Sequence, residues 1–363
     1  MGTIMADVSV RKGMPSAQLD KKEFKKRFLE KFYDPAFQTV RGELDKVAEV
    51  AWDGYDSYRK APRTVKAGNG FADPNYDLSI EWLETSKAIE AAERQQKDAK
   101  SPSRVLIVNG STRSEHTCPG EMSKTFRIAG IARDVIAAAT GFESEVLDLS
   151  RLASEYGRTI YPCKACVSTA QPLCHWPCSC YPNHAIGQTG DWMNEIYPKW
   201  VSAHGVMIVC PVNWYQAPSS LKLMIDRLVC ADGGNPDPTS TSGKDPMKAK
   251  RLELAGWPYP RHLAGRVFSV VVHGDAAGTE NLRRILTDWM SDIGMIPSGH
   301  LALVDRYVGY LTPYATSHDD LDQDTDFQDD VRNAALTLIQ AVKDRRSGKL
   351  QPADRGLHEA RPK

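Results

Sequence analysis

The chain has 363 residues, of which 46 are Lys or Arg and 46 are Asp or Glu, so its formal net charge at pH 7 is zero. This balance argues against a nucleic-acid-binding or membrane-surface protein, because both need a clustered positive excess. The 41% hydrophobic content suffices for an ordinary core, and no apolar run is long enough to span a bilayer. The first residues lack the apolar segment of a secretory signal, so we expect a cytoplasmic protein.

Residues 1–100 carry helical patterns and no strand-like run. Apolar residues recur at helical spacing in residues 21–33, 36–60 and 79–99, with a segment rich in Gly and Pro at 61–76. Helices of this kind bury little surface on their own. We therefore predict an α-helical N-terminal extension over residues 1–100, which packs on the following domain or on a second subunit.

From residue 104 the pattern changes to an alternation of strands and helices. We predict strands at 104–109, 143–149, 205–211, 266–273 and 300–304, helices at 122–140, 190–203, 219–229, 279–293 and 329–345, and a long loop at 231–263. This alternation predicts an α/β domain over residues 101–346, with a parallel sheet covered by helices on both faces. The polar tail, 347–363, is expected to be disordered.

The loop after the first strand predicts an anion site. The segment RVLIVNGSTRSEHTCPGEMSKTFR (104–127) is a buried strand, a polar loop and the start of a helix. Backbone N–H groups and the positive end of the helix dipole favour an anion at such a place. The segment adds hydroxyl and cationic donors: Ser111, Thr112, Arg113, Ser123, Lys124 and Thr125. We therefore expect a phosphate-bearing ligand at this edge of the sheet.

Two further loops follow strands at the same edge. One runs from Pro211 through Val212, Asn213, Trp214 and Tyr215, and it offers aromatic faces and backbone amides to a flat ring. The other begins His273-Gly274-Asp275, and its glycines permit close backbone approach. Ligands of doubly wound sheets bind where such loops converge. The three loops together predict a site for a planar heterocycle that carries one phosphate, with His273 either a ligand contact or a structural histidine.

These motifs resemble the flavodoxin-like NADPH-dependent FMN reductase family. The likeness covers roughly residues 104–305 and rests on Gly110, Ser111 and Arg113, and on Pro211, Trp214, Tyr215, Pro218, Leu221, Lys222, Asp226 and Arg227. It implies a five-stranded parallel sheet of order 2-1-3-4-5. In the family the first loop holds the FMN phosphate, which implies this role for Ser111, Arg113, Ser123 and Thr125. Asn213, Trp214 and Tyr215 are then near the isoalloxazine ring, with Gly274 and Asp275 on its other flank.

The resemblance implies an FMN-dependent NAD(P)H oxidoreductase. Reducing equivalents pass from NAD(P)H through FMN to an unidentified acceptor, which is a small molecule or a redox protein. Because the flavin carries the hydride chemistry, no catalytic side chain is assigned. Reductases of this fold usually pair their flavin sites across a dimer, which implies a homodimer or homotetramer.

Five of the eight cysteines fall in the loop after the second strand: Cys163, Cys166, Cys174, Cys178 and Cys180. Such a cluster suggests a metal or redox site, and it partly resembles that of the iron–sulfur flavoproteins, although the spacing differs. Four thiolates suit a [4Fe–4S] cluster or Zn²⁺, and thiols that bind no metal are the third reading. Two alternative functions follow: an iron–sulfur flavoprotein electron carrier, and a non-catalytic Zn-binding flavodoxin-like scaffold.

Overall fold

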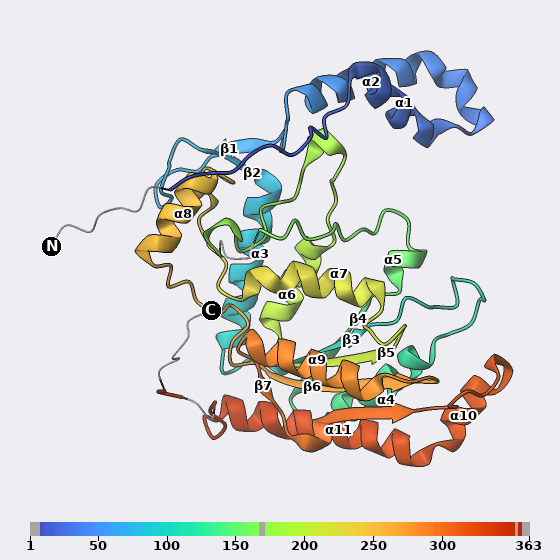
Figure 1. The fold of residues 1–363 in the computed structure, drawn as a ribbon. Helices are drawn as coiled ribbons and strands as arrows, with labels where there is room; N and C mark the ends of the chain where they lie inside the picture. Colours follow the sequence, from blue (N-terminus) through green and yellow to red (C-terminus); the bar gives the residue numbers. More distant parts are fainter. Residues whose placement is uncertain (1–7, 167–170, 353–354, 358–363) are drawn as a thin grey trace. The chain divides into compact units, whose positions relative to one another are not determined.

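The computed structural model describes residues 8–166, 171–352 and 355–357 (Figure 1). Contacts divide the chain into two compact units that interleave along the sequence. Unit 1 consists of Met1–Glu84, Cys166–Asp191 and Asn235–Trp257, and unit 2 of Thr85–Ala165, Trp192–Gly234 and Pro258–Lys363. This grouping differs from the expected linear division at residue 100, because two later segments group with the N-terminal residues.

Unit 2 is built on a parallel sheet of order β4-β3-β5-β6, in which β7 and β8 both pair with β6. The strands are β3 (Ser103–Asn109), β4 (Phe142–Asp148), β5 (Gly205–Pro211), β6 (Val267–Gly274), β7 (Ile296–Pro297) and β8 (Leu303–Tyr307). With β8 as the fifth predicted strand, this is the expected order 2-1-3-4-5. The two-residue strand β7 makes the sheet six-stranded rather than five-stranded.

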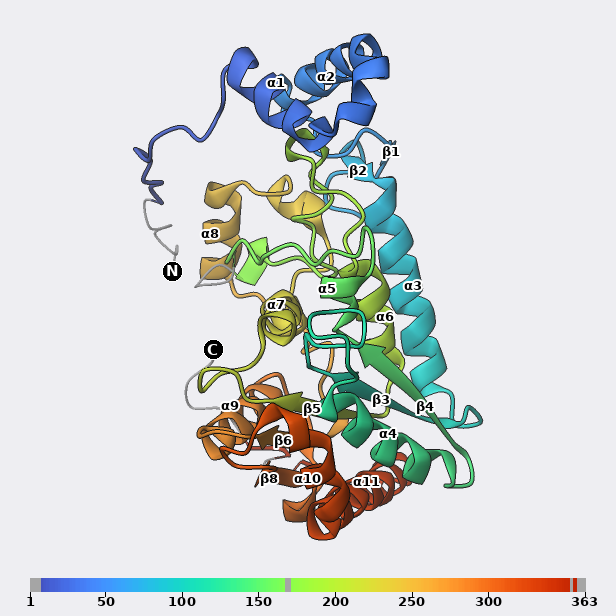
Figure 2. The ribbon, with the colours of Figure 1, turned by 90° about the vertical axis from the view of Figure 1, so that its right-hand side faces the viewer.

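Helices cover both faces of this sheet, as the alternation of elements predicts (Figures 1 and 2). Helices α4 and α11 pack on one face, where Val105 and Ile107 of β3 join their core. The next residue along the strand, Leu106, is equally buried and points to the opposite face, on the side of α6, α7 and α9. The helices are α3 (Ile80–Lys97, shared with unit 1), α4 (Lys124–Ala137), α5 (Arg151–Ser154), α6 (Met193–Ser202), α7 (Ser219–Leu228), α9 (Thr279–Asp292), α10 (Ser317–Gln323) and α11 (Thr325–Arg346). Short 3-10 helices are η5 (Val229–Ala231), η7 (His300–Ala302) and η8 (Tyr314–Thr316).

The strand register brings the three predicted loops to one edge. Pro211 at the end of β5 pairs with His273 of β6, and the Val212 N–H donates to the His273 carbonyl (2.9 Å). At the end of β3, the Gly110 N–H donates to the Val209 carbonyl (2.8 Å). A Cβ at Gly110 would lie 2.7 Å from the Cys210 Cβ, so only glycine allows the first loop to leave the sheet here.

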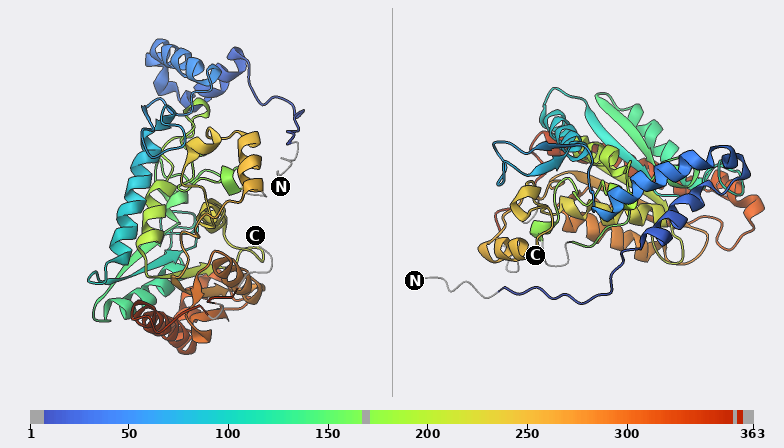
Figure 3. Two further views of the ribbon diagram at one scale, coloured as in Figure 1. Left: turned by 90° about the vertical axis from the view of Figure 1, so that its left-hand side faces the viewer. Right: turned by 90° about the horizontal axis from the view of Figure 1, so that it is seen from above.

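Unit 1 contains an antiparallel pair of helices, α1 (Lys21–Leu29) and α2 (Arg41–Asp56), which Figure 3 shows from two sides. It also holds a small hairpin, β1 (Thr64–Lys66) and β2 (Asp77–Ser79), and helix α8 (Pro246–Ala255). Its 3-10 helices are η1 (Glu30–Phe32), η2 (Pro35–Val40), η3 (Gln171–Leu173), η4 (His184–Ile186) and η6 (Pro238–Thr241). Both the hairpin and α8 correct the sequence analysis, which placed no strand in residues 1–100 and only a loop at 231–263.

Three predicted boundaries also change at the C-terminal end. Residues 300–302 form η7 and the strand follows at 303–307, and the last helix begins at Thr325 rather than Asp329. Helix α11 ends at Arg346, one residue beyond the predicted end. The predicted disorder of 347–363 falls partly on residues 353–354 and 358–363, which lie outside the described residues. Across the described chain, no helix combines the length and apolar character that a membrane crossing needs.

Candidate functional site

The three loops line a cavity of about 170 Å³ at the carboxyl edge of the unit 2 sheet. This is below the ~300–1,000 Å³ of a pocket that encloses a whole drug-sized ligand, so the cavity suits one end of a larger molecule. All predicted cofactor residues except Trp214 and Tyr215 line it: Ser111, Arg113, Ser123, Lys124, Thr125, Pro211, Val212, Asn213, His273, Gly274 and Asp275. The structure thus brings together residues from three separate loops.

Three lining residues were missed by the sequence analysis: Met122, Ser317 and His318. Ser317 and His318 begin α10, a helix that the sequence analysis did not predict. The His318 Nε2 donates to the Met122 carbonyl (2.9 Å), which ties α10 to the first loop. This contact joins residues 196 positions apart, so no local sequence signal could have indicated it.

The start of α4 supplies the clearest anion-binding features. The Ser123 hydroxyl caps the helix by accepting from the Phe126 N–H (3.1 Å). The N–H groups of Lys124 and Thr125 stand in the first turn, where a helix offers no acceptor of its own. The Lys124 side chain is half-buried and has no carboxylate partner among the described residues. A half-buried cation without a counter-ion, beside free N–H groups, favours a bound anion.

Arg113 lines the same cavity but is already engaged. Its Nη2 donates to the Tyr314 hydroxyl (2.8 Å) and lies 3.3 Å from a carboxylate oxygen of Glu121. Its guanidinium carbon also stands 4.7 Å above the centre of the Tyr314 ring. Part of the Arg113 charge is therefore compensated within the chain, which makes Lys124 the stronger candidate for a ligand phosphate.

A buried pair, Thr125 and His273, forms the floor of the cavity. The Thr125 hydroxyl and the His273 Nε2 are 2.8 Å apart, and the His273 Nδ1 is buried without a hydrogen-bond partner. Burial, aided by the charge of Lys124, lowers the pKa of His273 from its usual 6.5 to about 3. The imidazole is therefore neutral at pH 7, so that it can hold a proton on one nitrogen and accept on the other.

The second loop ends in a tight turn that presents two aromatic rings. Asn213 and Gln216 exchange both backbone hydrogen bonds (2.9 and 3.0 Å), and the two residues between them have positive φ angles, 49° at Trp214 and 65° at Tyr215. This conformation is unfavourable for large L-residues and persists only where the surroundings impose it. The Trp214 side chain is 94% exposed. The turn thus holds a flat aromatic surface in solvent beside the cavity.

Gly274 allows the second and third loops to touch. A Cβ built there would lie 2.6 Å from the Val212 Cγ1 and 3.0 Å from the Ala276 carbonyl oxygen. Any larger residue would have to displace the Val212 side chain and would press on the Ala276 carbonyl, so glycine is needed at this position for close approach.

The predicted metal site is not supported. Within the described residues, no group of three or more His, Cys, Asp or Glu side chains is arranged to hold a metal ion. Cys163 belongs to unit 2, whereas Cys166, Cys174, Cys178 and Cys180 belong to unit 1. The Cys166 and Cys180 sulfurs are 3.4 Å apart, and their hydrogen bond raises the pKa of Cys180 to about 11.

Cys174 and the neighbouring His175 are held by contacts within unit 1. Cys174 is buried, and its carbonyl accepts from the Asn235 N–H (2.7 Å). Its neighbour His175 has both ring nitrogens next to hydroxyls, those of Ser179 and Thr241. Burial lowers the pKa of His175 to about 4. These contacts join Cys174 and His175 to residues 179, 235 and 241 within unit 1.

A larger cavity, about 470 Å³, lies within unit 1. Its walls come from α1, α2 and η4 and are mainly apolar, with Phe24, Phe28 and Tyr55 among them. None of the predicted cofactor residues lines it, so it is not the site that the loops predicted.

Comparisons with known proteins identify the region that contains the site. The family model of NADPH-dependent FMN reductase matches residues 103–308. Among solved structures, RosB with a bound 8-demethyl-8-formylriboflavin-5'-phosphate intermediate is similar at 13% identity and a TM-score of 0.47, over 68% of this chain and 82% of that one. A flavone reductase is similar at 14% identity and a TM-score of 0.39, over 67% of this chain and 63% of that one. An NAD(P)H:quinone oxidoreductase from Methanothermobacter marburgensis is similar at 15% identity and a TM-score of 0.35, over 69% of this chain and 99% of that one. No curated protein matches the chain.

Proposed function

The chain belongs to the NADPH-dependent FMN reductase family and is an FMN-dependent NAD(P)H oxidoreductase, and we propose that the cavity at the carboxyl edge of the sheet binds the FMN phosphate. The observation that carries this proposal is Lys124, a half-buried cation without a carboxylate partner among the described residues, at the N-terminus of α4. A phosphate there would accept hydrogen bonds from the ammonium and from the first N–H groups of the helix.

The remaining residues fit the rest of FMN. The cavity is too small for the whole molecule, so the ring lies outside it, against the Asn213–Gln216 turn. Gly274 has no side chain, so a flat ring can approach the backbone of the third loop closely. The neutral His273 and Thr125 form the bottom of the cavity. When bound, FMN supplies the hydride chemistry, and the protein contributes binding, orientation and exclusion of water.

A visible spectrum tests this assignment directly. Protein reconstituted with FMN and desalted is expected to show bound-flavin absorption that NADPH or NADH bleaches under anaerobic conditions. Protein that releases all FMN on desalting, with its fold intact by circular dichroism, would show that the cavity is not an FMN site.

We infer that the acceptor is a planar aromatic molecule, since the turn holds the Trp214 ring in solvent beside the site. Trp214→Asn keeps the turn, because Asn tolerates positive φ, and removes the ring. We expect the KM for a quinone to rise about two- to tenfold, the equivalent of one aromatic contact. The KM for ferricyanide, which has no ring, is the control. An equal change for both acceptors would show that Trp214 does not contact the acceptor.

We also propose that the chain assembles as a homodimer or homotetramer, partly through α2. Val47 and Val50 lie on one face of α2 and are 51% and 67% exposed, and only Ala48 and Tyr55 of this helix are buried. A helix pair that buries so little of its own apolar surface favours a protein partner. The double variant V47D/V50D is expected to lower the assembly state measured by light scattering, and Glu43→Gln on the same helix is the control. An unchanged mass would exclude this face as a subunit contact.

A further inference from the structure

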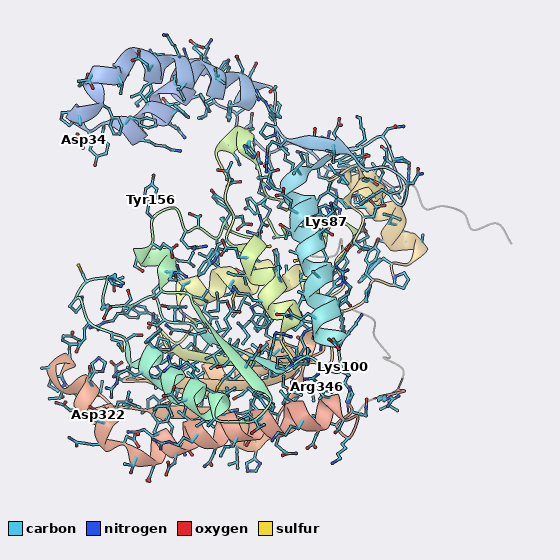
Figure 4. The ribbon with its side chains drawn as sticks, turned by 180° about the vertical axis from the view of Figure 1, so that it is seen from behind. Asp34, Lys87, Lys100, Tyr156, Asp322 and Arg346 are labelled. Carbon is cyan, nitrogen blue, oxygen red and sulfur yellow. The ribbon has the colours of Figure 1, made fainter. Side chains whose placement is uncertain are left out.

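A second polar cavity lies at the opposite, amino edge of the unit 2 sheet. It measures about 500 Å³, within the ~300–1,000 Å³ range of ligand pockets. His204 and Arg266, which line it, directly precede β5 and β6, whereas the proposed FMN cavity follows the other ends of these strands. The C-terminal ends of α3 and α11 complete the wall; Figure 4 shows the label of Arg346 beside that of Lys100, just beyond α3.

The charge of this cavity is strongly one-sided. Its lining holds a single carboxylate, Glu93, which is paired with Lys97 (2.6 Å). Burial lowers the pKa values of the lining histidines, that of His204 to about 4, so they add no charge at pH 7. The cationic lining residues are Lys97, Arg261, Arg266, Arg345 and Arg346.

Three of the arginines form no ion pair among the described residues, although the Glu93 carboxylate interacts electrostatically with Arg266. Arg345 donates to the Gly265 carbonyl (2.8 Å) and Arg346 to the carbonyls of Asp98 and Ala99 (3.0 and 3.1 Å). Arg266 donates to the carbonyls of Val201 and His262 (2.7 and 3.0 Å). Among the described residues, none of the three pairs with a carboxylate. Carbonyl groups orient a guanidinium but do not neutralise it.

Arg266 is the least expected of these groups. It is 5% exposed, and its Nε is buried without a hydrogen-bond partner. Burial lowers its pKa to about 10, so it remains charged at pH 7. A buried cation with an unused donor destabilises the protein unless an anion compensates it.

We propose that this cavity is a second ligand site, which binds a small molecule carrying a diphosphate group. Guanidinium groups match phosphate oxygens in pairs, and several converging cations suit an anion with more than one negative group. The volume leaves room for an organic part beside the diphosphate. The site is distinct from the FMN cavity, so its ligand is expected to act as a regulator or a stabiliser rather than as an electron carrier.

Isothermal titration of the FMN-loaded protein with inorganic pyrophosphate tests the proposal. FMN occupies the other phosphate site, so one further binding event is expected, weaker at high salt. Arg345→Gln and Lys97→Gln are each expected to weaken it about tenfold, the loss of one charge-assisted hydrogen bond. Lys87→Gln is the matched control. Lys87, labelled in Figure 4, is an exposed residue of α3 that does not line the cavity. It lies ten positions before Lys97, which is about 15 Å along the helix. Arg266→Gln tests the buried arginine in the same way. Because loss of its two carbonyl contacts could impair folding, the proposal is judged on Arg345→Gln and Lys97→Gln.

Each outcome is informative. ADP binding more tightly than pyrophosphate identifies a nucleotide ligand, and equal affinity identifies the diphosphate itself; both support the proposal. Absence of binding, or equal weakening by Lys87→Gln, overturns it. Inorganic phosphate binding as tightly as pyrophosphate overturns the diphosphate assignment. Loss of binding in Lys124→Met but not in Arg345→Gln shows that pyrophosphate occupies the FMN cavity instead.

Discussion

Replacing Lys124 with methionine is expected to weaken FMN binding by about ten- to a hundredfold, since a hydrogen bond to a charged group contributes about 1.5–3 kcal/mol. The substitution keeps the length of the side chain and removes only the ammonium. Because no described carboxylate pairs with Lys124, no counter-ion is left behind. Fluorescence titration of the flavin-free variant with FMN gives the dissociation constant, and riboflavin, which lacks the phosphate, should bind both proteins equally.

The stability of the flavin-free variant separates this role from a structural one. Lys124 lowers the pKa of His273 and has no ion pair of its own among the described residues. Its removal should therefore leave the free energy of unfolding, measured with urea, unchanged or slightly higher. The matched control is Lys222→Met, an exposed lysine of α7 that pairs with Asp226. If Lys124→Met and Lys222→Met affect FMN affinity equally, or if riboflavin affinity falls with that of FMN, the assignment of Lys124 to the phosphate is wrong.

The parts of the fold that sequence could predict are those with strong local signals. Strand β3 is an uninterrupted buried run from Val105 to Asn109, and the nearby Cys210 and Leu221 side chains require the glycine that follows it. The parallel order then carries the ends of β3, β5 and β6 to one edge, so their loops had to meet. This is why nearly all the predicted cofactor residues line one cavity, although the ligand that they bind stays a prediction.

The parts that sequence missed depend on contacts between distant segments. Helix α8 had a usable signal, because Asp245 caps it by accepting from the Met247 N–H (2.8 Å) and Pro246 fills its first position. Gly and Pro dominate the surrounding segment, which is why the pattern as a whole predicts a loop. His318 had no such signal, and neither did the burial of Cys174 and His175 against residues 235–241.

Acidification is expected to destabilise unit 2 through His273, even before carboxylates titrate. Its pKa is about 3 in the folded protein against 6.5 for an ordinary histidine, so below pH 6.5 the unfolded state binds more protons. Stability is therefore fully present above about pH 6.5 and is lost as the pH falls toward 3. Between pH 7 and pH 5 this single group should remove about 2 kcal/mol from the free energy of unfolding, at 1.36 kcal/mol per pH unit.

Urea unfolding of the flavin-free protein at pH 7, 6 and 5 measures this loss. His273→Gln retains a partner for the Thr125 hydroxyl and cannot be protonated. Between pH 7 and pH 5 its free energy of unfolding should therefore fall by about 2 kcal/mol less than that of wild type, whatever the stability of the variant at pH 7. His116→Gln, at an exposed position of the first loop, should keep the wild-type dependence. Lys124→Met should show a smaller loss than wild type, because the charge that helps to exclude a proton from His273 is gone. Equal pH dependence in His273→Gln and wild type would mean that His273 takes up a proton as readily in the folded as in the unfolded state, and the lowered pKa of His273 would have to be abandoned.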